Sequence, residues 1–143
     1  MYKYAAKVNR IIDGDSIVLD IDLGFNTWLN NQSIRLHGID TPETRTRDLV
    51  EKQQGLLAKH RVESLIQPGD KVVVETIKDK HEKFGRILGV IQLQEGINLN
   101  ELLVEEALAV RYYGQSKAEI EARHLENRQF LINEGKIDPN ANQ

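Results

Sequence analysis

Residues 4–21 carry the sequence YAAKVNRIIDGDSIVLDI. Two runs rich in β-forming residues, 4–12 and 16–21, flank Asp13-Gly14-Asp15. Asp-Gly between two such runs is a strong signal for a β-hairpin, because these residues accept the backbone angles of a tight turn. The stretch therefore predicts that the fold begins with two antiparallel strands joined by an acidic turn.

The sequence that follows this hairpin alternates between strand and helix patterns. Residues 33–39 (SIRLHGI) form a third expected strand, and Pro42 ends it because proline cannot donate to a strand ladder. Leucines and polar residues then recur at helical spacing over 49–65. Two more β-rich runs, 71–77 and 87–93, complete a set of five expected strands.

The last third of the chain has the start and stop signals of two helices. Asn98 is expected to cap a short helix that runs through Ala107. Ser116 and Glu119 form a capping box for a final helix, on which either His124 or Leu125 belongs to the inner stripe, and Gly135 is the expected stop. Five strands and three helices indicate an α+β fold compatible with a five-stranded β-barrel of the OB type.

Size and composition indicate one globular domain. The chain has 143 residues, of which 40% are hydrophobic and 29% are charged. We expect the domain to span residues 1–137, followed by a flexible tail at 138–143. No apolar run approaches the roughly 18 residues of a membrane-spanning helix, so no membrane association is expected. The chain is expected to be monomeric.

Charge and residue usage narrow the classes of function. The net charge of -3 argues against a protein that coats nucleic acid by bulk positive charge, but it leaves room for a local phosphate site. The absence of cysteine excludes a thiolate zinc site and a cysteine nucleophile. The first ten residues contain no apolar signal segment, so we expect a cytoplasmic protein or the mature form of a secreted one.

Acidic residues stand at two turns of the expected barrel, Asp13 and Asp15 at one and Asp40 and Glu43 at the other. Carboxylates at strand ends can converge at the mouth of a barrel, and such hard oxygen ligands suit Ca²⁺ or Mg²⁺. Alternatively, Asp13 and Asp15 are ordinary turn formers, since aspartate bonds to its own backbone in turns.

Two arginines lie near these acids. Arg35 sits on the third expected strand, and Arg86 follows Gly85 at the entry to the fifth. The planar fork of a guanidinium can grip a phosphate through two hydrogen bonds. The alternative for each is a solvated surface arginine that binds nothing.

Three ordered segments together resemble the staphylococcal nuclease (thermonuclease) family: D-G-D-S at 13–16, R-L-H-G-I-D-T-P-E at 35–43 and K-F-G-R at 83–86. The resemblance extends over most of the chain. It implies an OB-type five-stranded barrel with three helices. It also implies Ca²⁺-dependent hydrolysis of DNA and RNA with little sequence specificity. Phe84 departs from the family pattern, because many members carry tyrosine at this position.

The resemblance also implies a role for each site residue. The carboxylates of Asp15 and Asp40 and the carbonyl of Thr41 would bind Ca²⁺, while Asp13 would hold a calcium-bound water. Glu43 would orient or deprotonate the attacking water. The remaining roles concern the substrate: Arg35 and Arg86 would bind the scissile phosphate, and Lys83, Phe84 and Tyr113 would contact the nucleic acid.

A non-catalytic nucleic-acid-binding OB-type module is the main alternative, because the family includes repeats that have lost their acidic residues. A purely binding module has no need of carboxylates beside a phosphate site, since they repel the phosphate unless a cation intervenes. The presence of the acids and both arginines therefore favours a nuclease. A protein-interaction domain without a ligand would leave these residues unexplained.

Overall fold

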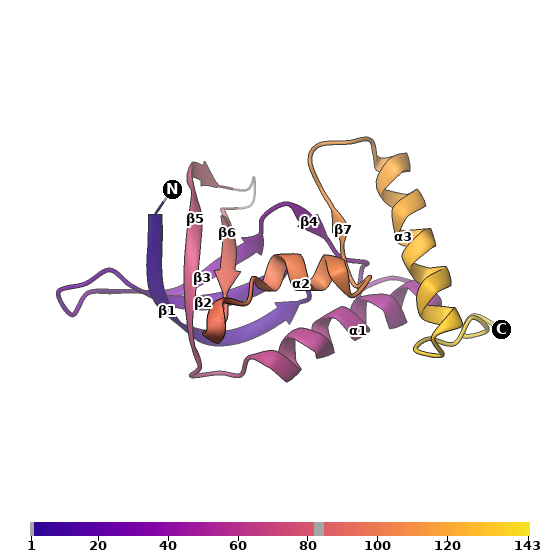
Figure 1. The fold of residues 1–143 in the computed structure, drawn as a ribbon, viewed down its shortest axis with the longest axis horizontal. Helices are drawn as coiled ribbons and strands as arrows, with labels where there is room; N and C mark the ends of the chain where they lie inside the picture. The colour runs from indigo at the N-terminus through magenta and orange to yellow at the C-terminus, as the bar shows by residue number, and fades with distance from the viewer. Residues whose placement is uncertain (1, 82–84) are drawn as a thin grey trace.

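The computed structural model describes residues 2–81 and 85–143 (Figure 1). In chain order the elements are β1 (Tyr2–Asp13), β2 (Ser16–Asp22), β3 (Trp28–Leu36), β4 (Ile39–Asp40), α1 (Leu49–Leu65), β5 (Lys71–His81), β6 (Ile87–Gln92), a 3₁₀ turn η1 (Gln94–Gly96), α2 (Leu99–Glu105), β7 (Val110–Arg111) and α3 (Lys117–Asn133).

Five strands close into a barrel in the order β1-β2-β3-β6-β5. The predicted hairpin forms, with Asp13 opposite Ser16 at its turn. β3 runs parallel to β6, and the other neighbouring pairs are antiparallel. With its three α-helices, the described part of the chain confirms the predicted α+β fold of the OB type.

A second, two-stranded sheet was not predicted. It pairs Ile39 with Arg111 and Asp40 with Val110. Each of its strands, β4 and β7, has only two residues, which is too short for a pattern of alternating polarity to appear in the sequence. This small sheet joins the end of the third barrel strand to the segment that leads into α3 (Figure 1).

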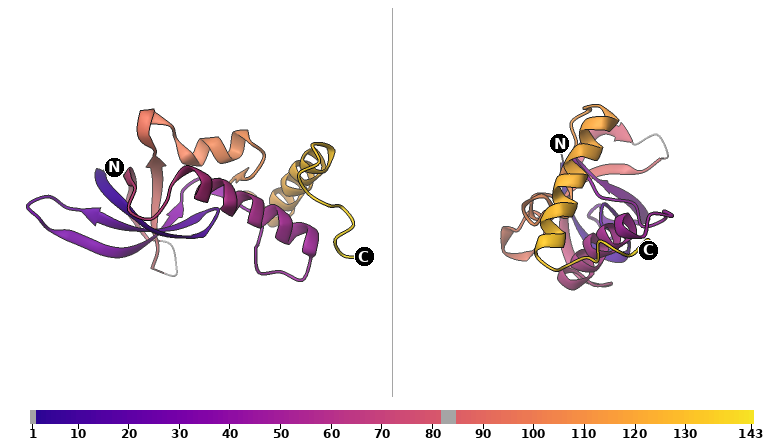
Figure 2. Two further views of the ribbon diagram at one scale, coloured as in Figure 1. Left: turned by 90° about the horizontal axis from the view of Figure 1, so that it is seen from below. Right: turned by 90° about the vertical axis from the view of Figure 1, so that its right-hand side faces the viewer.

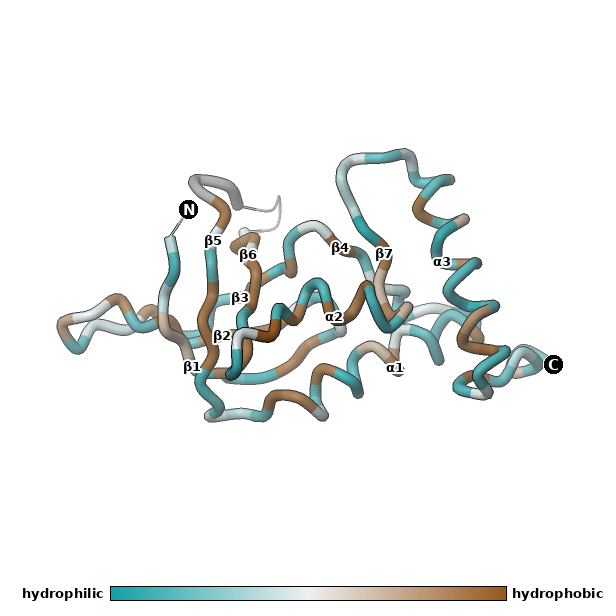
Figure 3. The backbone as a smooth tube through the Cα atoms, viewed as in Figure 1, coloured by the Kyte–Doolittle hydropathy of each residue, from teal (hydrophilic) through white to brown (hydrophobic). Residues whose placement is uncertain are grey.

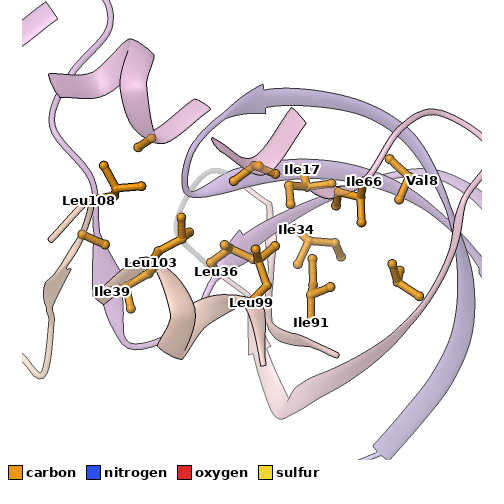
Figure 4. Packing of buried hydrophobic residues seen from close by; sticks show 14 of the residues in the cluster. Val8, Ile17, Ile34, Leu36, Ile39, Ile66, Ile91, Leu99, Leu103 and Leu108 are labelled. Carbon is orange, nitrogen blue, oxygen red and sulfur yellow. The ribbon is translucent and has the colours of Figure 1, made fainter. Parts of the chain in front are cut away.

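The core fills the barrel and continues beneath α2 (Figure 4). Ile17, Val18 and Leu19 are all buried although successive residues of a strand point to opposite faces. Both faces of β2 are therefore covered at this level. Leu99 and Leu103 pack from α2 against the same cluster.

Helix α1 has the predicted bounds, but its fully buried face is made of valines, Gln54 and small residues rather than leucines. Asp48 caps its start by accepting hydrogen bonds from the backbone N–H groups of Val50 and Glu51. The buried residues of the helix are Val50, Gln54, Gly55, Ala58 and Val62. Leu49, part of the helical pattern in the sequence, is 45% exposed.

Helix α3 lies at the far end of the molecule from the hairpin of β2 and β3 (Figures 1 and 2). The Ser116 hydroxyl caps it by accepting from the Glu119 N–H, as expected. Most of its length is hydrophilic (Figure 3), and of its residues, all of them described, only Leu131 is buried. His124 faces inward while Leu125 is exposed, which settles the alternative that the sequence left open.

The segment after α3 contacts the start of α1. The Asn142 carboxamide accepts a hydrogen bond from the Leu49 N–H at 2.7 Å and donates one to Asp48 at 2.9 Å. The flexibility of residues 138–143 stays a prediction. None of the helices in the described ranges is both long enough and apolar enough to cross a membrane.

Candidate active site

An open cleft of about 1170 Å³ lies where the β1–β2 turn, the end of β3, β4 and the segment after β7 meet. It brings together residues as far apart in the sequence as Asp13 and Gly114. The predicted site residues that line it are Asp13, Asp15, Arg35, Asp40, Thr41, Glu43, Arg86 and Tyr113. Lys83 and Phe84 lie outside the described residues, so their predicted contacts with substrate stay predictions.

The two acidic turns rest on the small residues of α1. A Cβ atom on Gly14 would lie 2.7 Å from the Cβ of Ala58. A Cβ atom on Gly55 would lie 2.7 Å from the carbonyl oxygens of both Pro42 and Glu43. Such distances are closer than carbon and oxygen atoms tolerate, so these glycines are needed for the turns to lie against the helix.

Arg35 connects the two turns. Its Nη1 lies 3.5 Å from Asp15 Oδ2, and its Nη2 lies 3.4 Å from Asp40 Oδ1. Nη1 also donates to the carbonyl of Leu36 at 2.9 Å, which holds the guanidinium in place. The Thr41 N–H donates to Asp15 Oδ2 at 3.3 Å, so the backbone after β4 is tied to the first turn as well.

The carboxylates in and around the cleft are close enough to change the pKa of Glu43. Partial burial is the largest cause that raises the pKa of the Glu43 carboxyl above its usual value, and the charge of Asp15 is the next largest. Three further carboxylates add to this rise: Asp40, Glu51 and Asp13. Burial and the neighbouring negative charges thus both favour the protonated form of Glu43.

Asp13 and Arg86 each contact a neighbouring hydroxyl. Asp13 Oδ1 accepts a hydrogen bond from the Thr44 hydroxyl at 2.8 Å, which ties the residue after Glu43 to the first turn. Arg86 Nη1 donates to the Ser16 hydroxyl at 3.0 Å, which places the second predicted arginine at the start of β2. Both predicted arginines thus lie at the same end of the barrel as the acids.

The tyrosine segment after β7 forms another wall of the cleft. Tyr112 and Tyr113 both line it, and Tyr113 is 77% exposed. The Tyr112 N–H donates to the carbonyl of Gly38 at 2.8 Å, and the Tyr113 N–H donates to Gln115 Oε1 at 2.8 Å. The backbone is therefore fixed while the Tyr113 ring is free to meet a ligand.

Two residues that support the cleft were not predicted. His124 Nε2 lies 2.8 Å from Asp40 Oδ2. Buried Asn100 donates to the carbonyls of His37 and Gly89 and accepts from the Ile91 N–H, so it fixes the end of β3 to β6. Neither belongs to a local motif, and only the ambiguous inner position of His124 on its helix could have indicated it.

The residues present fit a Ca²⁺ site of the predicted kind. Asp15 and Asp40 offer hard oxygen atoms, and both approach the same guanidinium, so their carboxylates lie near one another. Thr41 is buried beside them. Among the described residues, no group of three or more acidic or histidine side chains could hold an ion by itself. An ion here would therefore depend on backbone carbonyl and water ligands in addition to the two carboxylates.

Comparison with known proteins gives consistent matches. Residues 33–135 match the protein family described as Staphylococcal nuclease homologue. Endonuclease YhcR of Bacillus subtilis (strain 168) is 31% identical over 116 residues, which cover 78% of this chain and 9% of that protein. The thermonuclease of Staphylococcus hyicus is 33% identical over 103 residues, which cover 72% of this chain and 56% of that protein. The chain thus spans about half, or much less, of the length of these relatives.

Proposed function

The chain belongs to the family of staphylococcal nuclease homologues, and we propose that it is a calcium-dependent nuclease that hydrolyses the phosphodiester bonds of DNA and RNA. The names of its relatives, an endonuclease and a thermonuclease, support a hydrolase of this class. Little sequence specificity is expected, as the family resemblance implies, because contacts to phosphate carry no sequence information.

The observation that carries the proposal is the contact of Arg35 with both Asp15 and Asp40 in a cleft that Glu43 and Arg86 also line. Phosphodiester hydrolysis needs a positioned water, a base to take its proton and positive groups where negative charge develops. Glu43, which can take the proton, and Arg35 and Arg86, which carry positive charge, line the same cleft. No nucleophilic side chain is required.

In this proposal Asp15, Asp40 and the carbonyl of Thr41 would hold Ca²⁺. When bound, the ion would supply positive charge that offsets the carboxylates and attracts a phosphate oxygen. Asp13 would act on a water bound there, as the family resemblance implies. Its hydrogen bond to Thr44 also supports the loop that carries Glu43.

The chain's own groups then account for the bond changes. Glu43 accepts a proton from a water molecule as the water oxygen forms a bond to phosphorus. The bond between phosphorus and the sugar oxygen breaks, and that oxygen leaves with the electron pair and takes up a proton from solvent. Arg35 and Arg86 offset the charge that grows on the other phosphate oxygens. Three side chains are proposed to contact the rest of the substrate: Lys83, Phe84 and Tyr113.

Cleavage of fluorescently labelled single-stranded DNA, measured in Ca²⁺ and then in excess chelator, tests the proposal. We expect cleavage in Ca²⁺ only, and Asp40→Ala should abolish it while the protein stays folded. Asp22→Ala is a matched control, because Asp22 lies at the distant hairpin and accepts from the Gly24 N–H. Cleavage in chelator would refute the metal dependence. DNA binding without cleavage would instead support the non-catalytic module.

A further inference from the structure

Helix α3 places one side chain against a carboxylate of the cleft. His124 Nε2 lies 2.8 Å from Asp40 Oδ2, and the two residues are 84 positions apart in the sequence. The other oxygen of the same carboxylate, Oδ1, lies 3.4 Å from Arg35 Nη2. Asp40 is therefore held on one side by the C-terminal helix and on the other side by the barrel.

The contact has a defined direction. A carboxylate accepts hydrogen bonds, so the proton between the two groups belongs to Nε2 of the imidazole. The His124 side chain is 15% exposed, and its Nδ1 is buried with no hydrogen-bond partner among the described residues. Among the described residues, the hydrogen bond of this mostly buried ring is therefore the one between Nε2 and Asp40.

Attachment of α3 does not depend on this contact alone. Arg128 Nε donates to Gln54 Oε1 at 2.9 Å, and the Gln54 amide donates to the carbonyl of His124 at 3.2 Å. Asn127 Nδ2 donates to the carbonyl of Ala109 at 3.3 Å. These bonds join the helix to α1 and to the segment before β7 without touching an acid of the cleft. They allow the helix to stay attached when the imidazole is removed.

We propose that His124 is a positioning residue that fixes the Asp40 carboxylate for binding Ca²⁺. The inference rests on the proposed function, because it assumes that Asp40 is a metal ligand. An unrestrained aspartate can turn about its side-chain bonds, and holding Oδ2 removes that freedom before an ion arrives. Hydrogen bonds that orient a ligating side chain commonly change metal affinity by about 10- to 100-fold. α3 would thus complete the metal site without supplying a ligand.

Calcium binding measured by isothermal titration calorimetry on the full chain, without substrate, tests the role of His124. His124→Phe keeps a ring of similar size but removes the donor, and we expect its calcium affinity to fall about 10- to 100-fold. In His124→Gln the amide nitrogen reaches a position similar to Nε2, so this variant should recover most of the affinity. Asn127→Ala is the matched control, because it removes a bond of the same helix that does not reach Asp40.

Urea unfolding of each variant separates positioning from a purely structural role. We expect His124→Phe and Asn127→Ala to lose similar stability while only His124→Phe loses calcium affinity. Equal calcium affinity in His124→Phe and the parent would overturn the inference and leave the proposed function intact. No calcium binding by the parent would overturn the metal assignment itself. If His124→Phe does not fold, the calcium affinities of His124→Gln and His124→Asn are compared instead. Unequal affinities of these two amide variants are expected only if the donor must stand at a defined position, and equal affinities would overturn the inference.

Discussion

The barrel and helix α3 are held in the molecule by contacts of different kinds. The barrel encloses aliphatic side chains such as Ile34 and Ile91, which have no exposed surface, within a closed ladder of backbone hydrogen bonds. Helix α3 fully buries only Leu131, packs Ile132 partly against the core, and is otherwise attached by polar side chains. Burial of apolar surface is the main stabilising contribution to folding, so most of the free energy of unfolding resides in the barrel.

The two regions therefore have different roles within one domain. The barrel determines whether the chain folds, whereas the elements around the cleft determine the placement of a few polar groups. Regions with little apolar burial open locally at lower free energy than the core does. Substitutions in the two regions should therefore have separable effects, and four experiments can test this.

The largest effect is expected at Glu43, on chemistry alone. Glu43→Gln keeps the size of the side chain but removes its ability to take a proton, and kcat should fall about 10²- to 10⁴-fold. Substrate affinity and the urea midpoint should change little, as measured by DNA binding and by circular dichroism. Glu63→Gln, on the exposed face of α1, is the control and should keep parental turnover. Parental turnover in Glu43→Gln would end the proposed mechanism.

The next largest effect is expected in the core, on stability alone. Ile91→Ala leaves a cavity beside β3, and the free energy of unfolding should fall by about 2–5 kcal/mol in urea titration. The rate of cleavage per folded molecule should stay near the parental value. Leu125→Ala on the exposed side of α3 should change stability by no more than about 0.5 kcal/mol. An equal loss in both variants would contradict the separation of the two regions.

Gly55 should show a mixed effect, because it belongs to α1 but faces the loop that carries Glu43. Alanine normally favours a helix over glycine by about 1 kcal/mol. Here the added methyl group would meet the carbonyl oxygens of Pro42 and Glu43, so Gly55→Ala should destabilise the protein by about 1–3 kcal/mol. The shifted loop should also lower kcat. Glu63→Ala, on the exposed face of the helix, is the control, for which stabilisation and parental kcat are expected. The same result for Gly55→Ala would show that the loop does not need this close approach.

The smallest effect is expected at the start of α1. Asp48→Ala removes the helix cap and should cost about 1 kcal/mol near neutral pH. The hydrogen bond from Asn142 is the largest cause that lowers the pKa of Asp48 below its usual value. This stabilisation is present above the unfolded pKa of the carboxyl and is lost as the pH falls through the lower folded pKa.

The difference between the parent and Asp48→Ala should therefore narrow in acid, which urea titrations at several pH values can measure. Ser116→Ala is the control, because it removes the corresponding cap of α3 without removing an ionisable group. A difference in stability that is constant between neutral and strongly acidic pH would contradict the role of the Asp48 charge.

The elements that the sequence predicted are those with local causes. The Asp13-Gly14-Asp15 turn, the Asn98 cap and the Ser116 cap all depend on residues within a few positions of one another. The features that the sequence missed or left open depend on distant neighbours. Gly14 is needed because Ala58 approaches it, and the inward position of His124 depends on Asp40 rather than on hydropathy, which would favour Leu125.

The same division applies to the candidate site. The motif residues could be named from their order in the chain, and the structure brings most of them to one cleft. The contacts that hold them, such as the buried Asn100 between β3 and β6, join segments that share no local pattern. A single sequence contains no record of such contacts.

The seam between β1 and β5 has a consequence for how the chain reaches this structure. It places Tyr2 opposite Thr76 and Lys7 opposite Lys71, so the paired segments are about half the chain apart. Closing so long a loop costs entropy before any pairing compensates for it, and folds dominated by such contacts form in roughly milliseconds to seconds. The β1–β2–β3 meander can pair early. Until β5 and β6 add to it, its outer strand edges are unpaired and exposed to other chains. The protein is therefore most prone to aggregate during this interval, when newly made chains are crowded together.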